Sequence, residues 1–218
     1  MVSAAETGAS YSANRKLGIV ILGASTYPHF PPSRHLDNES FARSAAAFRS
    51  LMADESATVF GKPAILDLFD VSDDPASVIR RVQGFLKSAP ALTDILFYYC
   101  GHGAVLSDHT YYLTLKATDP ENEAFTGLQV RQMRLALEVQ LMRKRVFLVF
   151  DCCFAGKAAR EWMATGIGQV IEEEVLRSFP RQGLGLIAAS ARNKVAVALE
   201  REPRTMLLAL FSIRSRLA

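Results

Sequence analysis

Residues 145–156 read RVFLVFDCCFAG and decide the fold of the chain. Positions 146–150 are an unbroken run of β-branched, aromatic and aliphatic residues, which is typical of a central strand buried on both faces of a sheet. Asp151 and two cysteines follow directly, so we expect the strand to end at Asp151. In open sheets with helical crossovers, ligands and catalytic side chains lie at the carboxyl ends of the strands. The stretch therefore predicts a central strand that presents an acid and two thiols at its tip.

A second stretch of the same construction lies at residues 94–103, DILFYYCGHG. Its strand-like run gives way to His102, which stands between Gly101 and Gly103. Glycine allows tight turns and the close approach of a ligand to the backbone, which a structural histidine rarely needs. Cys153 follows His102 after 51 positions (153 − 102). A crossover of that length can place the two strands side by side, with both tips at one edge of the sheet.

Strand-like runs alternate with helical periodicities along the rest of the chain. Strands are predicted at residues 17–23, 64–69, 94–100, 111–115 and 183–190, and helices at residues 38–53, 75–88, 126–142 and, with many charges, 157–182. Asp37 and Asp74 are expected to be N-caps, with Pro75 at the first helical position and Thr126 opening the third helix. This alternation predicts an α/β fold with helices on both faces of the sheet.

Length and composition favour one domain and exclude several classes of protein. A chain of 218 residues with 50% hydrophobic content can bury one α/β core, predicted at residues 16–218 after a flexible tail at residues 1–15. The net charge of +3 gives no reason to expect a nucleic-acid partner. No stretch approaches the roughly 18 apolar residues that span a bilayer, so no membrane partner is expected. Three cysteines, two of them adjacent, suit a reducing compartment and predict a cytoplasmic protein.

The residues at the two strand tips have the chemistry of a cysteine peptidase. Such an enzyme needs a thiolate, a base beside it, and donors for the oxyanion of the tetrahedral intermediate. Cys153 and His102 can supply the first two, and the backbone N–H groups of Gly103 and Cys153 are candidates for the third. Cys152 competes with Cys153, because neighbouring side chains of a strand point to opposite faces and only one thiol can face His102. Cys100, His102, Cys152 and Cys153 have no C-x-x-C spacing, so no metal site is predicted.

The motifs YYCGHG at 98–103 and DCCFAG at 151–156 resemble the histidine and cysteine motifs of the caspase-like cysteine peptidases, especially metacaspases and their bacterial relatives. In caspases the histidine lies about 50 residues before the cysteine, so the spacing belongs to the resemblance and is no independent evidence. The resemblance extends over residues 17–190. It implies a caspase-like three-layer αβα sandwich with a mainly parallel central sheet of about six strands.

The same resemblance assigns roles to individual residues. It makes Cys153 the nucleophile and His102 the base, with Gly103 and Cys153 as oxyanion donors. Asp151 would line the pocket for the residue before the cut and favour arginine or lysine, as a partly buried carboxylate does on physical grounds. Asp119 resembles a second acid of such pockets, although it reads equally well as a solvated turn residue before a proline. Phe154 and the alanine after it depart from the family's usual polar pair.

The implied function is a cysteine endopeptidase that cleaves proteins or peptides after Arg or Lys, in a stress, defence or cell-death pathway. Four basic residues lie between the last two predicted strands: Lys157, Arg160, Arg177 and Arg181. They are interpreted either as self-cleavage sites used in activation or as the solvated face of a helix. No cofactor is expected. Calcium, which some metacaspases require, is suggested by Asp70, Asp73 and Asp74, which read more simply as turn and cap residues. The alternative function is an inactive caspase-like module that binds a regulatory protein or another domain.

Overall fold

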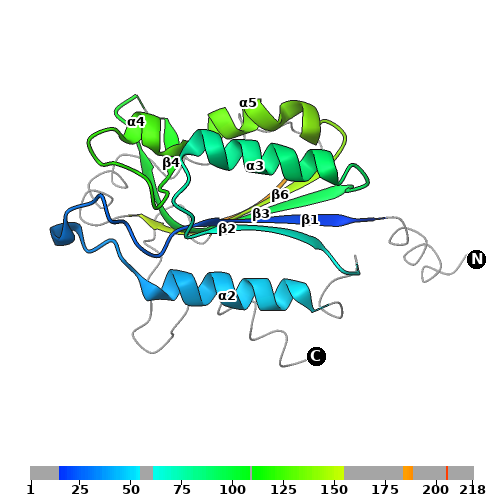
Figure 1. The fold of residues 1–218 in the computed structure, drawn as a ribbon, viewed down its shortest axis with the longest axis horizontal. Coiled ribbons are helices and arrows are strands. Elements are labelled where there is room, and N and C mark those ends of the chain that lie inside the picture. The colour runs from blue at the N-terminus through cyan, green and yellow to red at the C-terminus, as the bar shows by residue number, and fades with distance from the viewer. Residues whose placement is uncertain (1–14, 55–60, 109, 155–183, 189–204, 206–218) are drawn as a thin grey trace, which may run out of the picture.

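A computed structural model of the chain describes residues 15–54, 61–108, 110–154, 184–188 and 205, with the backbone alone at 153–154 and 184–188. It has an α/β fold, built on a mixed sheet (Figure 1). The strands are β1 (Leu17–Gly23), β2 (Ala64–Phe69), β3 (Asp94–Val105), β4 (Tyr111–Leu113), β5 (Leu128–Gln129), β6 (Arg145–Phe154) and β7 (Leu184–Ala188). The helices are the 3-10 turn η1 (Pro32–Arg34), α2 (Glu39–Ala53), α3 (Pro75–Ser88), α4 (Glu123–Thr126) and α5 (Val130–Leu141).

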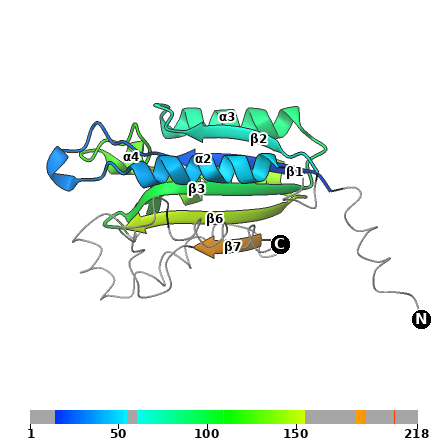
Figure 2. The ribbon, with the colours of Figure 1, turned by 90° about the horizontal axis from the view of Figure 1, so that it is seen from below.

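Five strands of the sheet are parallel and lie in the order β2-β1-β3-β6-β7 (Figure 2). β3 is the longest of them, and its last residues extend beyond the end of β1. There β4 pairs antiparallel with β3, and β5 pairs antiparallel with β4. The parallel strands therefore bring the carboxyl ends of β1, β3 and β6 to one edge, and the hairpin flanks that edge.

Helices cover the two faces of the sheet separately (Figure 1). α3 and α5 pack on one face, over a core that includes Val20, Phe97 and Leu148 from three neighbouring strands. α2 packs on the other face, where Phe41 and Phe48 contact the alternate residues of the same strands, such as Ile19, Tyr98 and Val149. Successive residues of β1, β3 and β6 thus enter different cores, which explains why these strands read as continuous apolar runs.

Several predicted elements are confirmed. β1 and β2 have the predicted bounds, and α3 begins at Pro75 with the Asp74 carboxylate accepting a hydrogen bond from the backbone N–H of Ser77. The N-cap of α2, however, is Asn38. The carboxylate of Asp37, predicted for that role, accepts the backbone N–H of Tyr27 instead, at 2.7 Å.

The predicted helix at 126–142 is wrong at its start. Thr126 ends the short helix α4, a two-residue strand follows, and α5 begins at Val130. The hydroxyl of Thr126 donates to the carbonyl of Asn122 at 2.8 Å, which is a contact made back along the chain. The side chain of Thr126 thus closes α4 and does not open α5.

The predicted ends of the two central strands are also wrong. β3 continues past Cys100 to Val105, and β6 continues past Asp151 to Phe154. The two extensions pair with each other, from Cys100 opposite Asp151 to Gly103 opposite Phe154. The polar ends of both strands therefore stay inside the sheet, each held by its neighbour.

Three predicted segments lie outside the described residues: residues 1–14 of the predicted tail, the charged segment at 157–182 with its four basic residues, and residues 191–218 except Thr205. Arg15, the last residue assigned to the tail, forms an ion pair with Asp94 at the amino end of β3, with 2.7 Å between the guanidinium nitrogen and the carboxylate oxygen. No helix in the described ranges is both long and apolar enough to cross a membrane.

Candidate active site

The register of β3 and β6 brings the predicted base and nucleophile together. His102 and Cys153 are directly opposite each other in the parallel ladder, with Gly101 opposite Cys152 and Gly103 opposite Phe154. Adjacent strands of a sheet lie about 5 Å apart, so the two backbones are in contact distance. The separation of 51 positions (153 − 102) is thus spanned as the sequence predicts.

His102 is buried and held in a defined orientation. Its ring lies on the α2 face of the sheet, where it meets the Phe41 ring edge-on at 5.0 Å and the Tyr27 ring at 5.2 Å. Nε2 is 2.8 Å from the backbone carbonyl oxygen of Leu36. Because a carbonyl can only accept, Nε2 must carry the proton of this hydrogen bond. In the neutral imidazole this leaves the lone pair on Nδ1.

The backbone of His102 is fixed as firmly as its ring. Its N–H donates to the Tyr27 hydroxyl at 3.2 Å, and that hydroxyl donates to the carbonyl of Ala24 at 2.8 Å. Its carbonyl oxygen accepts the N–H of Thr114 at 2.8 Å and also the hydroxyl of Tyr99. Residues from the β1–α2 loop and from the segment after β4 thus converge on one histidine.

Tyrosine hydroxyls fill the space beside the two glycines that flank His102. Both glycines lie within strand β3 and do not form a turn. A Cβ at Gly101 would meet the hydroxyls of Tyr27 and Tyr99 at 2.8 Å, and a Cβ at Gly103 would collide with the hydroxyl of Tyr111. Burial raises the pKa of the Tyr99 and Tyr111 phenols, so these groups stay protonated donors. Gly103, the predicted oxyanion donor, lies in the ladder between β4 and β6.

The two candidate thiols differ in position. Cys152 is 6% exposed and lies in the core beneath α3 and α5, with its Sγ 3.4 Å from the Tyr111 hydroxyl. That core is on the opposite side of the sheet from the His102 ring. The structure therefore does not bring Cys152 and His102 together, and Cys153 is the cysteine whose position faces His102 in the register.

Asp151 is buried in a network of hydroxyl groups on the α2 face. The side chain is 2% exposed, and one carboxylate oxygen accepts hydrogen bonds from Tyr98, at 2.8 Å, and from Thr205. The Thr205 N–H in turn donates to the hydroxyl of Ser44 in α2 at 2.8 Å. Burial raises the pKa of Asp151, and the two hydrogen bonds oppose that rise. Among the residues that the structure describes, no cation pairs with this carboxylate.

Asp119 makes the contacts of a turn residue. Its carboxylate accepts the backbone N–H of Glu121 at 2.9 Å and the side-chain amide of Asn122 at 2.8 Å. These hydrogen bonds lower its pKa. The structure does not join Asp119 to Asp151, and a role for Asp119 in substrate binding stays a prediction.

The three aspartates considered for calcium each have a partner in the protein. The Asp70 carboxylate accepts the N–H and hydroxyl of Ser25, both at 2.7 Å. Asp73 pairs with Arg81, and Asp74 caps α3. Within the described ranges, no cluster of His, Cys, Asp and Glu is arranged to hold a metal ion. A calcium requirement stays a prediction.

Sequence reasoning missed Leu36, Tyr27 and Thr205. Leu36 acts through its backbone carbonyl, so its side chain gives no signal. Tyr27 lies in the proline-rich loop between β1 and α2, whose length is a signal that could have drawn attention to it, since long loops are often functional. Thr205 reaches Asp151 across 54 residues of sequence, a contact that no local pattern predicts.

No protein-family model matches the chain, and no curated protein matches it. Its fold is similar to the crystal structure of protein GSU0716 from Geobacter sulfurreducens, with a TM-score of 0.56. The two share 15% sequence identity, and the match covers 92% of this chain and 82% of that one. At this level of identity the likeness concerns the fold alone.

Proposed function

We propose that the chain is a caspase-like cysteine endopeptidase in which His102 and Cys153 form the catalytic dyad. The observation that carries this proposal is their direct pairing in the β3–β6 register, at the carboxyl edge of parallel strands. The proposed fold is correspondingly the three-layer caspase-like sandwich, with its five parallel strands as the central sheet. The motifs around both residues support the same family.

The proposed mechanism assigns the two imidazole nitrogens different tasks. Nε2–H remains bonded to the Leu36 carbonyl in the neutral and the charged ring, so it orients the imidazole throughout. Nδ1 accepts the thiol proton of Cys153, and the thiolate attacks the carbonyl carbon of the scissile peptide bond. When the tetrahedral intermediate collapses to a thioester, the same proton passes from Nδ1 to the leaving amine. Water then hydrolyses the thioester, with His102 again as base.

Asp151 supports a preference for arginine or lysine before the cut. Side chains alternate along a strand, so positions 151 and 153 belong to the same face of β6. The Asp151 carboxylate lies on the α2 face of the sheet, as does the His102 ring. A guanidinium or ammonium group of the substrate that reached this carboxylate would supply an opposite charge, which the described residues do not. It would also oppose the rise in pKa that burial causes. We assign the activity to the cytoplasm, because a reducing compartment keeps the nucleophile as a thiol.

The adjacent cysteines provide a matched test. Cys153→Ala should reduce hydrolysis of Arg- and Lys-aminomethylcoumarin peptides by about a thousandfold or more, because it removes the nucleophile. Cys152→Ala removes the neighbouring thiol from the core, so it should keep most of the activity and lower stability by about 1–2 kcal/mol. Asp-aminomethylcoumarin peptides serve as the specificity control.

Equal activity of Cys153→Ala and the wild type would refute the dyad. If the wild type neither cleaves any of these peptides nor reacts with a thiol-directed peptide probe, the alternative function is favoured. The chain would then be a binding module that keeps the fold without the chemistry.

A further inference from the structure

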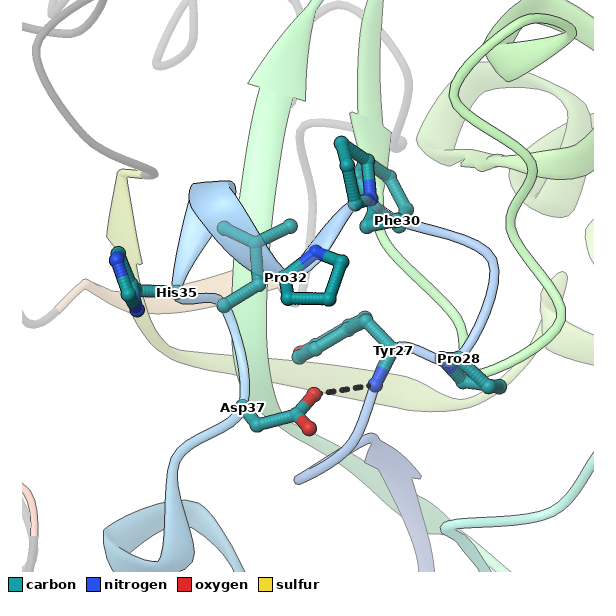
Figure 3. A pocket seen from close by; sticks show the side chains of 8 residues that line it. Tyr27, Pro28, Phe30, Pro32, His35 and Asp37 are labelled. Atoms are coloured by element: carbon teal, nitrogen blue, oxygen red, sulfur yellow. Dashed lines mark hydrogen bonds between the residues drawn. The ribbon is translucent and has the colours of Figure 1, made fainter.

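The loop between β1 and α2 forms a pocket of its own (Figure 3). The cavity has a volume of about 330 Å³ and is lined by residues of this loop: Tyr27, Pro28, Phe30, Pro31, Pro32, His35, Leu36 and Asp37. Tyr27, Phe30 and Leu36 are buried and form a small apolar cluster with Ala24, separate from the two main cores. The prolines are exposed. The cavity therefore has the buried Tyr27, Phe30 and Leu36 as its floor and exposed prolines at its rim, and the polar side chains of His35 and Asp37 also line it.

Contacts within the loop hold the residues around this pocket in place. The Tyr27 N–H is bound by the Asp37 carboxylate, as the dashed line in Figure 3 marks, and the Phe30 N–H donates to the Tyr27 carbonyl at 3.1 Å. The two aromatic rings meet edge-on, with 6.2 Å between centroids. The guanidinium of Arg34 lies 5.5 Å from the centre of the Phe30 ring. A preformed pocket needs little reordering when it binds.

Two residues of the floor are also the residues that hold His102. The Tyr27 hydroxyl accepts the His102 N–H, and the Leu36 carbonyl accepts the proton on Nε2. The pocket and the imidazole thus share Tyr27 and Leu36 as neighbours. In the proposed reaction the imidazole gives its proton to the leaving amine, so the leaving half of the substrate must lie against this ring.

We infer that this pocket binds an apolar side chain of the substrate at the first or second residue after the cut. The inference rests on the proposed peptidase function and adds a determinant of its specificity. The volume of about 330 Å³ is at the lower end of the range for ligand sites, which suits one side chain better than a cofactor. Proline rings and the faces of Tyr27 and Phe30 favour aromatic or large aliphatic groups.

Quenched fluorescent peptides with arginine before the cut test the inference. The wild type should cleave peptides with phenylalanine after the cut with a kcat/KM roughly tenfold above that for serine, since apolar pockets discriminate by such factors. Pro32→Glu places a carboxylate at the exposed rim and should reduce this preference to about threefold or less. Pro90→Glu, an exposed proline that does not line the pocket, is the matched control and should leave the preference unchanged.

Arg-aminomethylcoumarin separates the two hypotheses, because it has no amino acid after the cut. The wild type and Pro90→Glu should hydrolyse it equally. If this substrate is cleaved but phenylalanine and serine peptides are equivalent at both positions, the pocket inference is wrong and the peptidase function stands. If the wild type cleaves no substrate, the peptidase function fails and the pocket inference fails with it.

Discussion

Two buried aspartates at opposite ends of the β3–β6 pair differ in how their charge is compensated. Asp94, at the amino end, is 0% exposed and binds the guanidinium groups of Arg15 and Arg145 at 2.7 and 2.8 Å. Burial opposes its ionisation, but these hydrogen bonds prevail and lower its pKa. Asp151, at the carboxyl end, has hydroxyl donors, and its pKa is raised.

Under the proposed function, the difference distinguishes a structural end of the sheet from the catalytic one. A buried carboxylate with two guanidinium partners is satisfied and ties the start of β1 to β3 and β6. A buried carboxyl group with only hydroxyl partners can still form an ion pair with a cation that binds beside it. Groups with perturbed pKa values cluster at functional sites. We therefore expect changes at Asp94 to affect stability and changes at Asp151 to affect substrate binding.

Asp94→Asn should have the largest effect on stability. It leaves two guanidinium groups without their carboxylate, and breaking a buried pair of this kind costs about 3 kcal/mol. Urea unfolding at neutral pH measures the loss. Asp73→Asn, which breaks the exposed pair with Arg81, is the control and should cost less than about 1 kcal/mol. Peptidase activity should stay within twofold of the wild type.

The effect of Asp94→Asn should also depend on pH. The folded pKa is lowered, so the ionised carboxylate stabilises the fold above the ordinary aspartate pKa of about 4 and that contribution disappears as pH falls through the folded value. The gap between Asp94→Asn and the wild type should therefore narrow in acid. A gap that widens in acid would contradict the charge compensation described for this end.

The sequence predicts the elements whose signals are local. The pair Asp74-Pro75 marks the start of α3, and the apolar runs give β1 and β2 their bounds, because capping and burial act on neighbouring residues. The pairing of His102 with Cys153 is expected from two strand patterns and the length of the crossover between them.

The remainder depends on contacts between distant segments. Gly101 and Gly103 suggest a break in β3, but tyrosine hydroxyls from other segments fill the space beside them, and the strand continues. The hydrogen bond from His102 to the Leu36 carbonyl joins residues 66 apart and involves no side chain of Leu36. Such contacts are visible only once the chain is folded.

Asp151→Asn should have a smaller effect on stability, and of the opposite sign. The pKa of Asp151 is raised in the folded protein. As pH rises above about 4, this carboxyl group therefore ionises first in the unfolded chain. The wild type loses stability over this range until the pH passes the folded pKa. Asparagine does not ionise, and at pH 7 this variant should equal or exceed the wild type by about 1 kcal/mol. Its kcat/KM for Arg and Lys substrates should fall about tenfold.

Urea unfolding from pH 4 to 8 and peptide kinetics measure both effects. If Asp151→Asn loses as much stability at neutral pH as Asp94→Asn, the two ends of the sheet do not differ in the way proposed. Unchanged kinetics with Arg and Lys peptides would remove Asp151 from the substrate pocket.

Gly84→Ala should have the smallest effect on stability. It tests the difference between the glycines beside His102 and a glycine far from the site. Gly84 lies within α3, exposed, with no atom within 4 Å of an added Cβ. Alanine should stabilise the helix by about 0.5–1 kcal/mol, measured as a small rise in Tm. The same change at Gly103 would meet the Tyr111 hydroxyl, so a rise in Tm there would contradict the packing described beside His102.

The tyrosines packed around the carboxyl edge also give the protein an optical reporter of its own unfolding. Burial raises the pKa of Tyr27, Tyr98, Tyr99, Tyr111 and Tyr112 above the ordinary phenol value. These are five of the six tyrosines in the chain, so almost no phenolate should form near pH 10 while the fold persists. After a jump to alkaline pH, ultraviolet absorbance from phenolate should rise at the rate at which the sheet opens.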